Sequence, residues 1–289
     1  MATRTAAKPK LQIRHHGKNH SYALDGEPQK GRGVTTLLSA GLPAGGLVVW
    51  AARAVATETV DKRDVWEPIL REAGRDAAWE FLSKAPDRDR DSAANRGSEV
   101  HNLAERLAAG ETVEVPEELE GMVDAYLDWR ATWDPTDELN EVVGANLTHR
   151  YFGRFDGLAT FTGWWPDRPT EPARILYDIK TSRSGPFEKD ALQLTAYRHF
   201  ELCGIPDEKG RIFEPEPMPA VDGVAVLHLS ADGYRFIPIA EHLDRPLFAA
   251  FLHVLRTAEF LGTGWKAEDR GWSKDVFCPP IDTPHQEAS

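Results

Sequence analysis

The segment at residues 175–181, Ile-Leu-Tyr-Asp-Ile-Lys-Thr, constrains the fold of this chain more than any other. Its apolar start predicts a buried β-strand, and side chains on a strand alternate between the two faces of the sheet. Asp178 and Lys180 are therefore expected on one face, with Ile179 between them pointing into the core. The fold must accommodate a buried strand that ends in a carboxylate and an ammonium group held close together.

The hydrophobic pattern on either side of this strand predicts a mixed α/β protein. Further strands are expected at residues 141–151, 154–161, 223–229 and 234–239, and a small β-hairpin at 11–25. Apolar residues at helical spacing predict helices at residues 47–54, 64–82, 96–109, 116–133, 187–203 and 245–261. The charged stretch at residues 87–91 is expected to form a solvated turn. These elements predict a central mixed β-sheet flanked by helices.

The chain shows no internal repeat and no clear domain boundary. We therefore expect a single domain at residues 11–265, in which an N-terminal hairpin and helices (11–135) lead into a core that carries the chemistry (96–261). Residues 1–10 are expected to be a disordered tail and residues 266–289 an irregular one.

Composition narrows the class of protein. Hydrophobic residues make up 41% and charged residues 28% of the chain, which is typical of globular proteins. Two cysteines, Cys203 and Cys278, are too few for a disulfide framework or a four-cysteine cluster, which favours a reducing cytoplasm. The start of the chain lacks a signal-peptide pattern, and the most apolar window, residues 41–60, contains Arg53 and Glu58. A soluble cytoplasmic protein without a membrane span is expected.

The net charge of −12 argues against a surface that coats nucleic acid, because such surfaces cluster Lys and Arg against the phosphates. The charge is unevenly distributed, however. Residues 141–200 contain eight Lys or Arg and seven Asp or Glu, a net of +1, which leaves −13 for the remainder. Any contact with nucleic acid is therefore expected to be local and confined to a cleft.

A second acid, Asp156, lies in an apolar run flanked by glycines, in the strand that precedes residues 175–181. If the two strands pair, Asp156 and Asp178 reach the same ion, and Mg²⁺ and Mn²⁺ prefer such oxygen ligands. Ordinary alternatives exist for both, a strand-end salt bridge with Lys180 for Asp178 and a turn acid for Asp156. A second Asp-x-Lys sequence, at residues 207–209, lies in a polar loop without a strand to hold it.

Two predicted helices add polar side chains one turn apart. His101 is followed by Glu105, and Gln193 by Tyr197, so each pair shares one helix face. His101 offers an imidazole to a metal, and Gln193 with Tyr197 could hold a nucleic-acid backbone and steady the lysine. Alone, each pair would more often be structural or lie on a helix surface. The nearby acids favour the functional interpretation.

In this order, four segments resemble motifs of the PD-(D/E)XK nuclease superfamily, in particular the RecB-type exonucleases of bacteria and their phages. They are Gly97-Ser-Glu-Val-His101, Gly153-Arg-Phe-Asp156-Gly157, Asp178-Ile-Lys180 and Gln193-Leu-Thr-Ala-Tyr197. The opening segments Gly33-Val-Thr-Thr-Leu-Leu and Leu47-Val-Val-Trp50 are also similar to phage-encoded members. The resemblance spans residues 11–200. It implies a restriction-endonuclease-like α/β core, with the central mixed sheet flanked by helices, and an N-terminal helical elaboration.

The resemblance also implies roles for individual residues. Asp156, Asp178, the Ile179 carbonyl and His101 would bind Mg²⁺ or Mn²⁺, and Lys180 would orient or activate the attacking water. Relatives that contain an iron–sulphur cluster use four cysteines for it, so no cluster is expected in this chain.

The same resemblance assigns further residues. Gln193 and Tyr197 would be the helix motif typical of the RecB branch, and they are counted with the catalytic residues. Glu141 and Glu105 are additional candidate metal ligands. The expected DNA contacts are Arg150, Arg154, Arg183 and Arg198.

The implied function is a divalent-metal-dependent DNA exonuclease that acts on DNA ends in recombination, repair or replication of a bacterial or phage genome. Two alternatives use the same scaffold: a structure-specific or restriction-like endonuclease, and a non-catalytic protein that binds DNA ends. The set of Asp156, Asp178 and Lys180 speaks against the non-catalytic alternative. A metabolic enzyme is supported only by the negative charge. A single-strand annealing recombinase is the partner that the resemblance suggests, and the oligomeric state is left open between a monomer and a ring.

Overall fold

The computed structural model describes residues 9–16, 19–43, 45–108, 110–182, 185–212, 214–262 and 271. The tails expected at residues 1–10 and 266–289 lie outside the described residues, apart from residues 9, 10 and 271.

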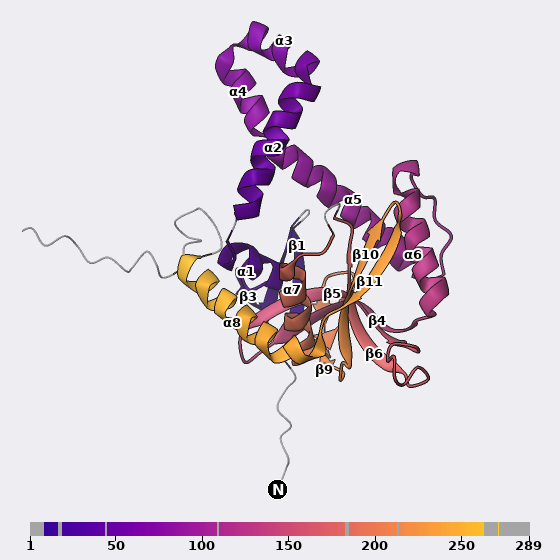
Figure 1. Ribbon diagram of the computed structural model, residues 1–289. Helices are drawn as coiled ribbons and strands as arrows, with labels where there is room; N and C mark the ends of the chain where they lie inside the picture. The colour runs from indigo at the N-terminus through magenta and orange to yellow at the C-terminus, as the bar shows by residue number, and fades with distance from the viewer. Residues whose placement is uncertain are drawn as a thin grey trace, which may run out of the picture.

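A mixed β-sheet is the centre of the fold (Figure 1). Among the described residues its strands are β4 (Thr136–Asn146), β5 (Tyr151–Phe161), β6 (Ala173–Lys180), β7 (Leu202–Gly204), β9 (Glu216–Pro217), β10 (Gly223–Ser230) and β11 (Gly233–Pro238). They are arranged in the order β11-β10-β6-β5-β4-β7-β9. β6 runs antiparallel to β5 and parallel to β10, so the central mixed sheet expected from the sequence is confirmed.

Helices cover both faces of this sheet. One face carries α1 (Val34–Gly41), α7 (Glu188–Arg198) and α8 (Asp244–Leu261), the last preceded by the 3-10 turn η2 (Glu241–Leu243). The other face carries α6 (Glu120–Trp133), preceded by the 3-10 turn η1 (Glu117–Leu119), and the C-terminal part of α5 (Ala85–Ala108). α7 connects the parallel strands β6 and β10, as such a pair needs a crossover.

Strand β6 alternates between the two faces as its sequence predicts. Ile175, Tyr177 and Ile179 are buried in the cluster formed with α5 and α6, whereas Leu176 is buried in the cluster formed with α1, α7 and α8. Asp178 and Lys180 share the face of Leu176 and contact α7. The period-2 pattern of one strand therefore directs both charged groups to one side of the sheet.

A small second sheet packs against the strand β5 side of the domain. It consists of β3 (Glu27–Gln29), β2 (Asn19–Leu24), β1 (Leu11–His16) and β8 (Arg211–Ile212), in that order. Tyr22 stacks on Phe152 with 5.7 Å between ring centroids, and this contact joins the two sheets. The hairpin expected at residues 11–25 is present and extended by a strand on each side.

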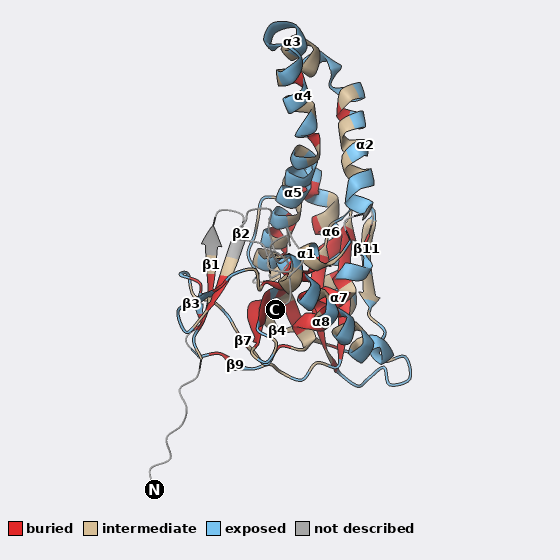
Figure 2. Cartoon of the chain, turned by 90° about the vertical axis from the view of Figure 1, so that its left-hand side faces the viewer, coloured by how far each residue is buried: buried red, intermediate tan, exposed pale blue. Residues whose placement is uncertain are grey.

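A helical arm projects from the sheet domain. It consists of α2 (Gly45–Asp61), α3 (Arg63–Ala73), α4 (Arg75–Ser83) and the N-terminal part of α5. Figure 2 shows that most of its residues are exposed, in contrast to the buried sheet. The arm gives the expected N-terminal helical elaboration an extended shape (Figure 1).

Two expectations about the arm were wrong. The helix expected at residues 64–82 is interrupted at Gly74, which adopts a φ of 85° that ends α3. Residues 87–91 are not a solvated turn but belong to α5. Residues 87–91 contain no glycine or proline that would break a helix. In addition, Arg88 bonds the buried carboxylate of Glu58 on α2 at 2.8 Å. That long-range ion pair stabilises helix where the charge pattern alone suggests a turn.

Two element boundaries also differ from expectation. α7 ends at Arg198, five residues before the expected end, and residues Leu202–Gly204 form β7 instead. The Asn146 side chain donates a hydrogen bond to the His199 carbonyl at 2.7 Å, which ends the helix beside β4. Strand β4 begins at Thr136 and ends at Asn146, before the tight turn into β5.

No described helix is by itself long and apolar enough to span a membrane. α1 and α2 would be long and apolar enough only if taken together, and they are bent by 89° relative to each other.

We predict that Trp129→Ala lowers the free energy of unfolding by about 3–5 kcal/mol, the usual cost of removing a buried tryptophan. Trp129 is fully buried, and its ring lies 5.2 Å from Tyr177 and 5.5 Å from Phe236 between centroids. Urea unfolding followed by circular dichroism measures the change. Leu127→Ala, at a position 43% exposed on the same helix, is the control and should cost less than about 1 kcal/mol. Equal losses in the two variants would contradict this description of the core.

Candidate active site

A cleft of about 670 Å³ lies at the point where strands β5 and β6 separate. The helices α1, α2, α5, α6 and α7 and strand β2 contribute further residues to its walls. The sequence-predicted site residues that line it are His101, Arg154, Asp156, Asp178, Ile179, Lys180, Gln193 and Tyr197. The tertiary structure thus brings together four motifs that are spread over about a hundred residues of chain.

Asp156 marks the point at which the two strands separate. The pairing of β5 with β6 begins at Phe161 and Ala173 and stops at Gly157 and Tyr177. Beyond this point the Asp156 carboxylate accepts the backbone N–H of Ile179 at 2.6 Å. A side-chain acceptor therefore replaces the missing strand partner, and the carboxylate is held at the opening of the cleft.

Glu141 lies opposite Asp156 on strand β4, since its neighbours Asn140 and Val142 pair with Gly157 and Phe155. Its φ is +53°, which is rare for a non-glycine residue inside a strand and costs about 1–3 kcal/mol. Strain of this kind persists only where the surrounding structure holds it, and it is common at functional sites. The strained backbone directs a carboxylate towards Asp156.

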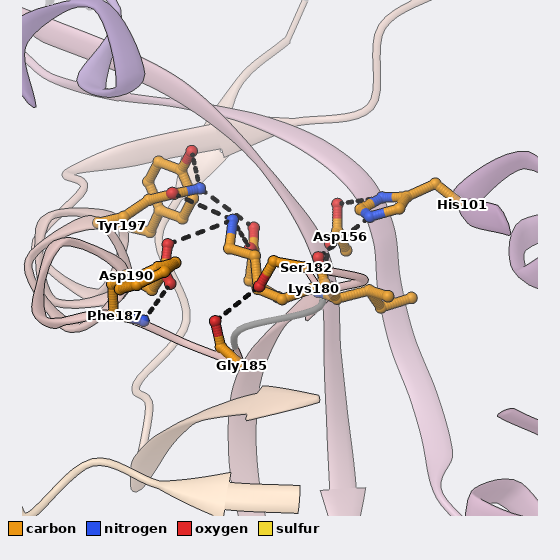
Figure 3. Close-up of polar contacts among 11 residues, drawn as sticks. His101, Asp156, Lys180, Ser182, Gly185, Phe187, Asp190 and Tyr197 are labelled. Atoms are coloured by element: carbon orange, nitrogen blue, oxygen red, sulfur yellow. Dashed lines mark hydrogen bonds and ion pairs between the residues drawn. The ribbon is translucent and has the colours of Figure 1, made fainter. Parts of the chain in front are cut away.

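Three side chains form a candidate ligand group among the described residues: His101, Glu141 and Asp156 each offer one donor atom within 4.8 Å of the others. His101 Nδ1 lies 3.2 Å from Asp156 Oδ1, and its Nε2 lies 3.0 Å from the Ile179 carbonyl oxygen (Figure 3). The two carboxylates and the nearby carbonyl are oxygen ligands of the kind that Mg²⁺ and Mn²⁺ prefer, whereas the imidazole is a ligand more typical of softer divalent metals. The oxygen donors therefore fit the metal that the sequence motifs imply.

The membership of this group differs in part from the sequence-based assignment. Glu141, an additional candidate from the sequence, lies beside Asp156, whereas Asp178 is outside this group and pairs with Lys180; its role as a ligand stays a prediction. Glu105, the other candidate ligand, is exposed and is not a member of the group. Glu141 precedes the turn into β5 by several residues, and its position depends on strand register, which the sequence pattern does not specify.

The charges in this group shift one another's pKa values. Burial lowers the pKa of His101, but attraction to Asp156 outweighs it and raises the pKa to about 9. Burial and repulsion by Asp156 raise the pKa of Glu141 to about 7. Burial opposes ionisation of Asp156, but the adjacent His101 lowers its pKa overall. A protonated imidazole thus neutralises these acids in the metal-free protein, and a divalent cation would replace that charge.

Lys180 is held by residues of helix α7 and of its own strand. Its Nζ lies 2.5 Å from Asp178 Oδ2 and 3.2 Å from Gln193 Oε1, to which it donates. The Gln193 amide nitrogen in turn donates to Asp178 Oδ1 at 3.3 Å and to the Tyr197 hydroxyl at 2.9 Å. Gln193 and Tyr197 are both buried, so their contacts position the lysine.

Asp190, which the sequence interpretation missed, also lies beside the lysine. Its carboxylate is buried, accepts the backbone N–H of Phe187 at 2.8 Å and lies 3.9 Å from Lys180 Nζ (Figure 3). An acid three residues into a helix is a recognisable capping signal. That signal could have identified Asp190, although not its proximity to the lysine.

The pKa values of Asp178 and Lys180 reflect their burial and pairing. Burial raises the pKa of Asp178 to about 6, although Lys180 acts in the opposite direction. Burial alone would lower the pKa of Lys180, but Asp178 and Asp190 raise it above its ordinary value. Lys180 therefore remains a cation at neutral pH.

The expected DNA-contacting arginines are not all placed at the cleft. Arg154 lines it and pairs with Glu141 at 2.8 Å. Arg150 donates to Gln29, and Arg198 donates to the Val221 carbonyl; neither lines the cleft. Arg183 lies outside the described residues. Arg96, which the sequence interpretation did not select, is on the cleft wall.

No model of a known protein family matches this chain, and no curated protein matches it either. Its function is therefore inferred from the chemistry of the cleft.

We predict that metal binding stabilises the protein more at about pH 9 than at about pH 7. The raised pKa of His101 means that its proton stabilises the fold fully below about pH 6.5 and that this contribution is lost as the pH rises through about 9. At about pH 7 nearly all molecules carry this proton, and a metal must displace it. At about pH 9 a smaller fraction of molecules carry it, so metal binding is opposed less. Thermal unfolding in EDTA and in excess Mg²⁺ or Mn²⁺ measures the shift in Tm.

Two variants control this measurement. His101→Gln should remove most of the pH dependence of the metal-induced shift. Glu105→Gln, on the same helix but outside the ligand group, should leave it unchanged. A metal-induced shift equal at both pH values, or an equal effect of the two variants, would count against this ligand group.

Proposed function

We propose that this protein is a divalent-metal-dependent deoxyribonuclease that hydrolyses phosphodiester bonds at DNA ends. The observation that carries the proposal is the proximity, in one cleft, of a carboxylate–imidazole group and a cation held in place by Gln193. Phosphodiester hydrolysis needs both, because negative charge accumulates on the phosphate as the bond breaks. The choice of DNA, and of ends, depends on the motif resemblance to RecB-type nucleases.

His101, Glu141 and Asp156, together with the Ile179 carbonyl, would hold the metal. Once bound, the metal supplies a Lewis acid for the scissile phosphate and lowers the pKa of a coordinated water. Where β5 and β6 separate, His101, Asp156 and Ile179 line the cleft, so a phosphate in the cleft would reach a metal held there.

The residues of the chain then have distinct tasks. Lys180 remains protonated, so it acts as a fixed positive charge beside the reacting phosphate rather than as a base. Gln193 bonds both Lys180 and Asp178, which fixes the direction of the ammonium group. Tyr197 completes this arrangement by accepting the second amide proton of Gln193. Preorganised charge of this kind costs no rearrangement during the reaction.

His101 has a second task, because its positive charge would be replaced by that of the metal. In the metal-free protein it bridges Asp156 and the Ile179 carbonyl as an imidazolium. To hold a metal, His101 would have to lose one proton, because only a neutral imidazole is a ligand. The same residue would thus neutralise the acids without a metal and be a ligand with one.

We predict that Lys180→Ala lowers the rate of Mg²⁺-dependent degradation of linear DNA by about 100- to 1,000-fold, the usual cost of removing one preorganised positive or donor group. Initial rates on an end-labelled duplex measure the change. The matched control is Lys209→Ala, in the other Asp-x-Lys sequence of the chain. There Asp207 is bonded to Arg211 in an exposed loop, so activity should be unchanged.

Closed circular DNA separates attack on ends from internal cleavage. Under the proposal, wild-type protein degrades linear DNA and leaves circles intact. Rapid nicking of circles would favour an endonuclease, and undiminished activity of purified Lys180→Ala protein on linear DNA would rule out the catalytic role of the lysine.

A further inference from the structure

The first turns of α2 expose an apolar surface next to the cleft. Leu47, Val48 and Val49 are 62%, 68% and 55% exposed, on consecutive positions of one helix. The adjacent Trp50 is half-buried. Several exposed apolar side chains on one short stretch of helix commonly mark a contact site. We call residues 47–50 the α2 ridge.

Trp50 connects the α2 ridge to the candidate active site. It lines the same cleft as Asp156, Asp178 and Lys180, although it comes from the opposite wall. Its indole N–H donates to Asp89 Oδ2 on α5 at 2.9 Å. This bond holds the polar edge of the ring at the cleft wall, so apolar or stacking contacts between Trp50 and a bound molecule would use the ring faces.

Cationic side chains flank the α2 ridge. Arg53 is exposed on α2, one helical turn after Val49, and Arg96 of α5 lines the cleft near Trp50. An aromatic platform beside scattered positive charges is the usual combination for binding single-stranded nucleic acid, because bases stack while phosphates meet Arg or Lys. The charges argue against a purely apolar protein partner, and the position of Trp50 and Arg96 on the wall of the cleft favours a strand that enters the cleft over a lipid surface.

We infer that the α2 ridge, with Trp50 as its stacking side chain, is a subsite for unpaired nucleobases of the DNA strand whose backbone enters the cleft. This inference rests on the proposed nuclease function and names its substrate class, single-stranded DNA or an unpaired end. Inside a duplex both faces of each base are already stacked, so a tryptophan face is open only to unpaired bases and to bases at an end. The arm then supplies base contacts, and the sheet supplies phosphate chemistry.

The test compares two strands that have the same number of phosphates, only one of which carries bases. Fluorescence anisotropy, with Ca²⁺ in place of Mg²⁺ to limit cleavage, gives the Kd for an oligothymidylate and for an abasic strand of the same length. Wild-type protein should prefer the base-bearing strand by about 5- to 150-fold, which corresponds to one stacked base. Trp50→Ala should reduce this preference at least fivefold (roughly one stacking contact).

Two variants separate stacking from other effects. Trp50→Phe retains an aromatic face but loses the bond to Asp89, and it should keep most of the preference. Trp79→Ala removes an equally large ring that is 70% exposed on α4 but does not line the cleft, and it should bind as wild type. Equal losses in Trp50→Ala and Trp79→Ala would overturn the subsite, as would wild-type protein with no preference for bases.

Two further measurements make the outcomes distinct. Sedimentation velocity of wild type and Trp50→Ala tests self-association: a dimer that this substitution disrupts, with base preference unchanged, would make the α2 ridge a contact between copies and overturn the inference. Hydrolysis of the oligothymidylate with Mg²⁺ tests the nuclease. If neither the oligothymidylate nor the linear duplex is hydrolysed while the base preference holds, the subsite stands as a DNA-binding site and the nuclease proposal fails.

Discussion

The hydrogen bond from the Ile179 N–H to the Asp156 carboxylate is the interaction on which the site depends. It lies where the pairing of β5 with β6 ends, so it satisfies a backbone donor that would otherwise be unpaired in a largely buried region. It also fixes both partners in place. Asp156 is held at the opening of the cleft, and Ile179 is held with its carbonyl beside His101. β4 and β10 hold the other edges of these two strands, so loss of this bond would free the Asp156 carboxylate and the Ile179 N–H on the cleft side alone.

The density of acids around this bond explains the other features of the site. Asp156, Asp178, Asp190 and Glu141 are largely buried and surround a small volume, and their mutual repulsion must be balanced by positive charge. Lys180 balances one side, next to Asp178 and Asp190, and His101 balances the other, next to Asp156. The two cations are not equivalent. The pKa of Lys180 is raised so that it stays charged, whereas His101 can release its proton when a cation takes its place. This division suits a site with one permanent and one exchangeable positive charge.

The helical arm adds a second chemistry to the same cleft. Its own core is small, and it is stabilised by ion pairs such as Arg88 with Glu58 rather than by extensive apolar packing. An element of this kind gains little stability from its exposed valines and leucine. Their location beside Trp50 accords with a surface that contacts another molecule, and the anchoring of Trp50 by Asp89 accords with a ring held ready for it.

The sequence by itself determined the parts that depend on local periodicity. The alternation along residues 175–181 correctly predicts that Asp178 and Lys180 share a face opposite Ile179, and a spacing of four correctly places Gln193 beside Tyr197. The mixed sheet and most of its strands follow from the same patterns. Only the tertiary structure decided which acids meet. Glu141 reaches Asp156 through strand register and a positive φ. Asp190 reaches Lys180 because α7 packs beside β6. Residues 87–91 are held in a helix by the ion pair of Arg88 with Glu58. Such contacts join residues distant in sequence, so no periodicity within one segment encodes them.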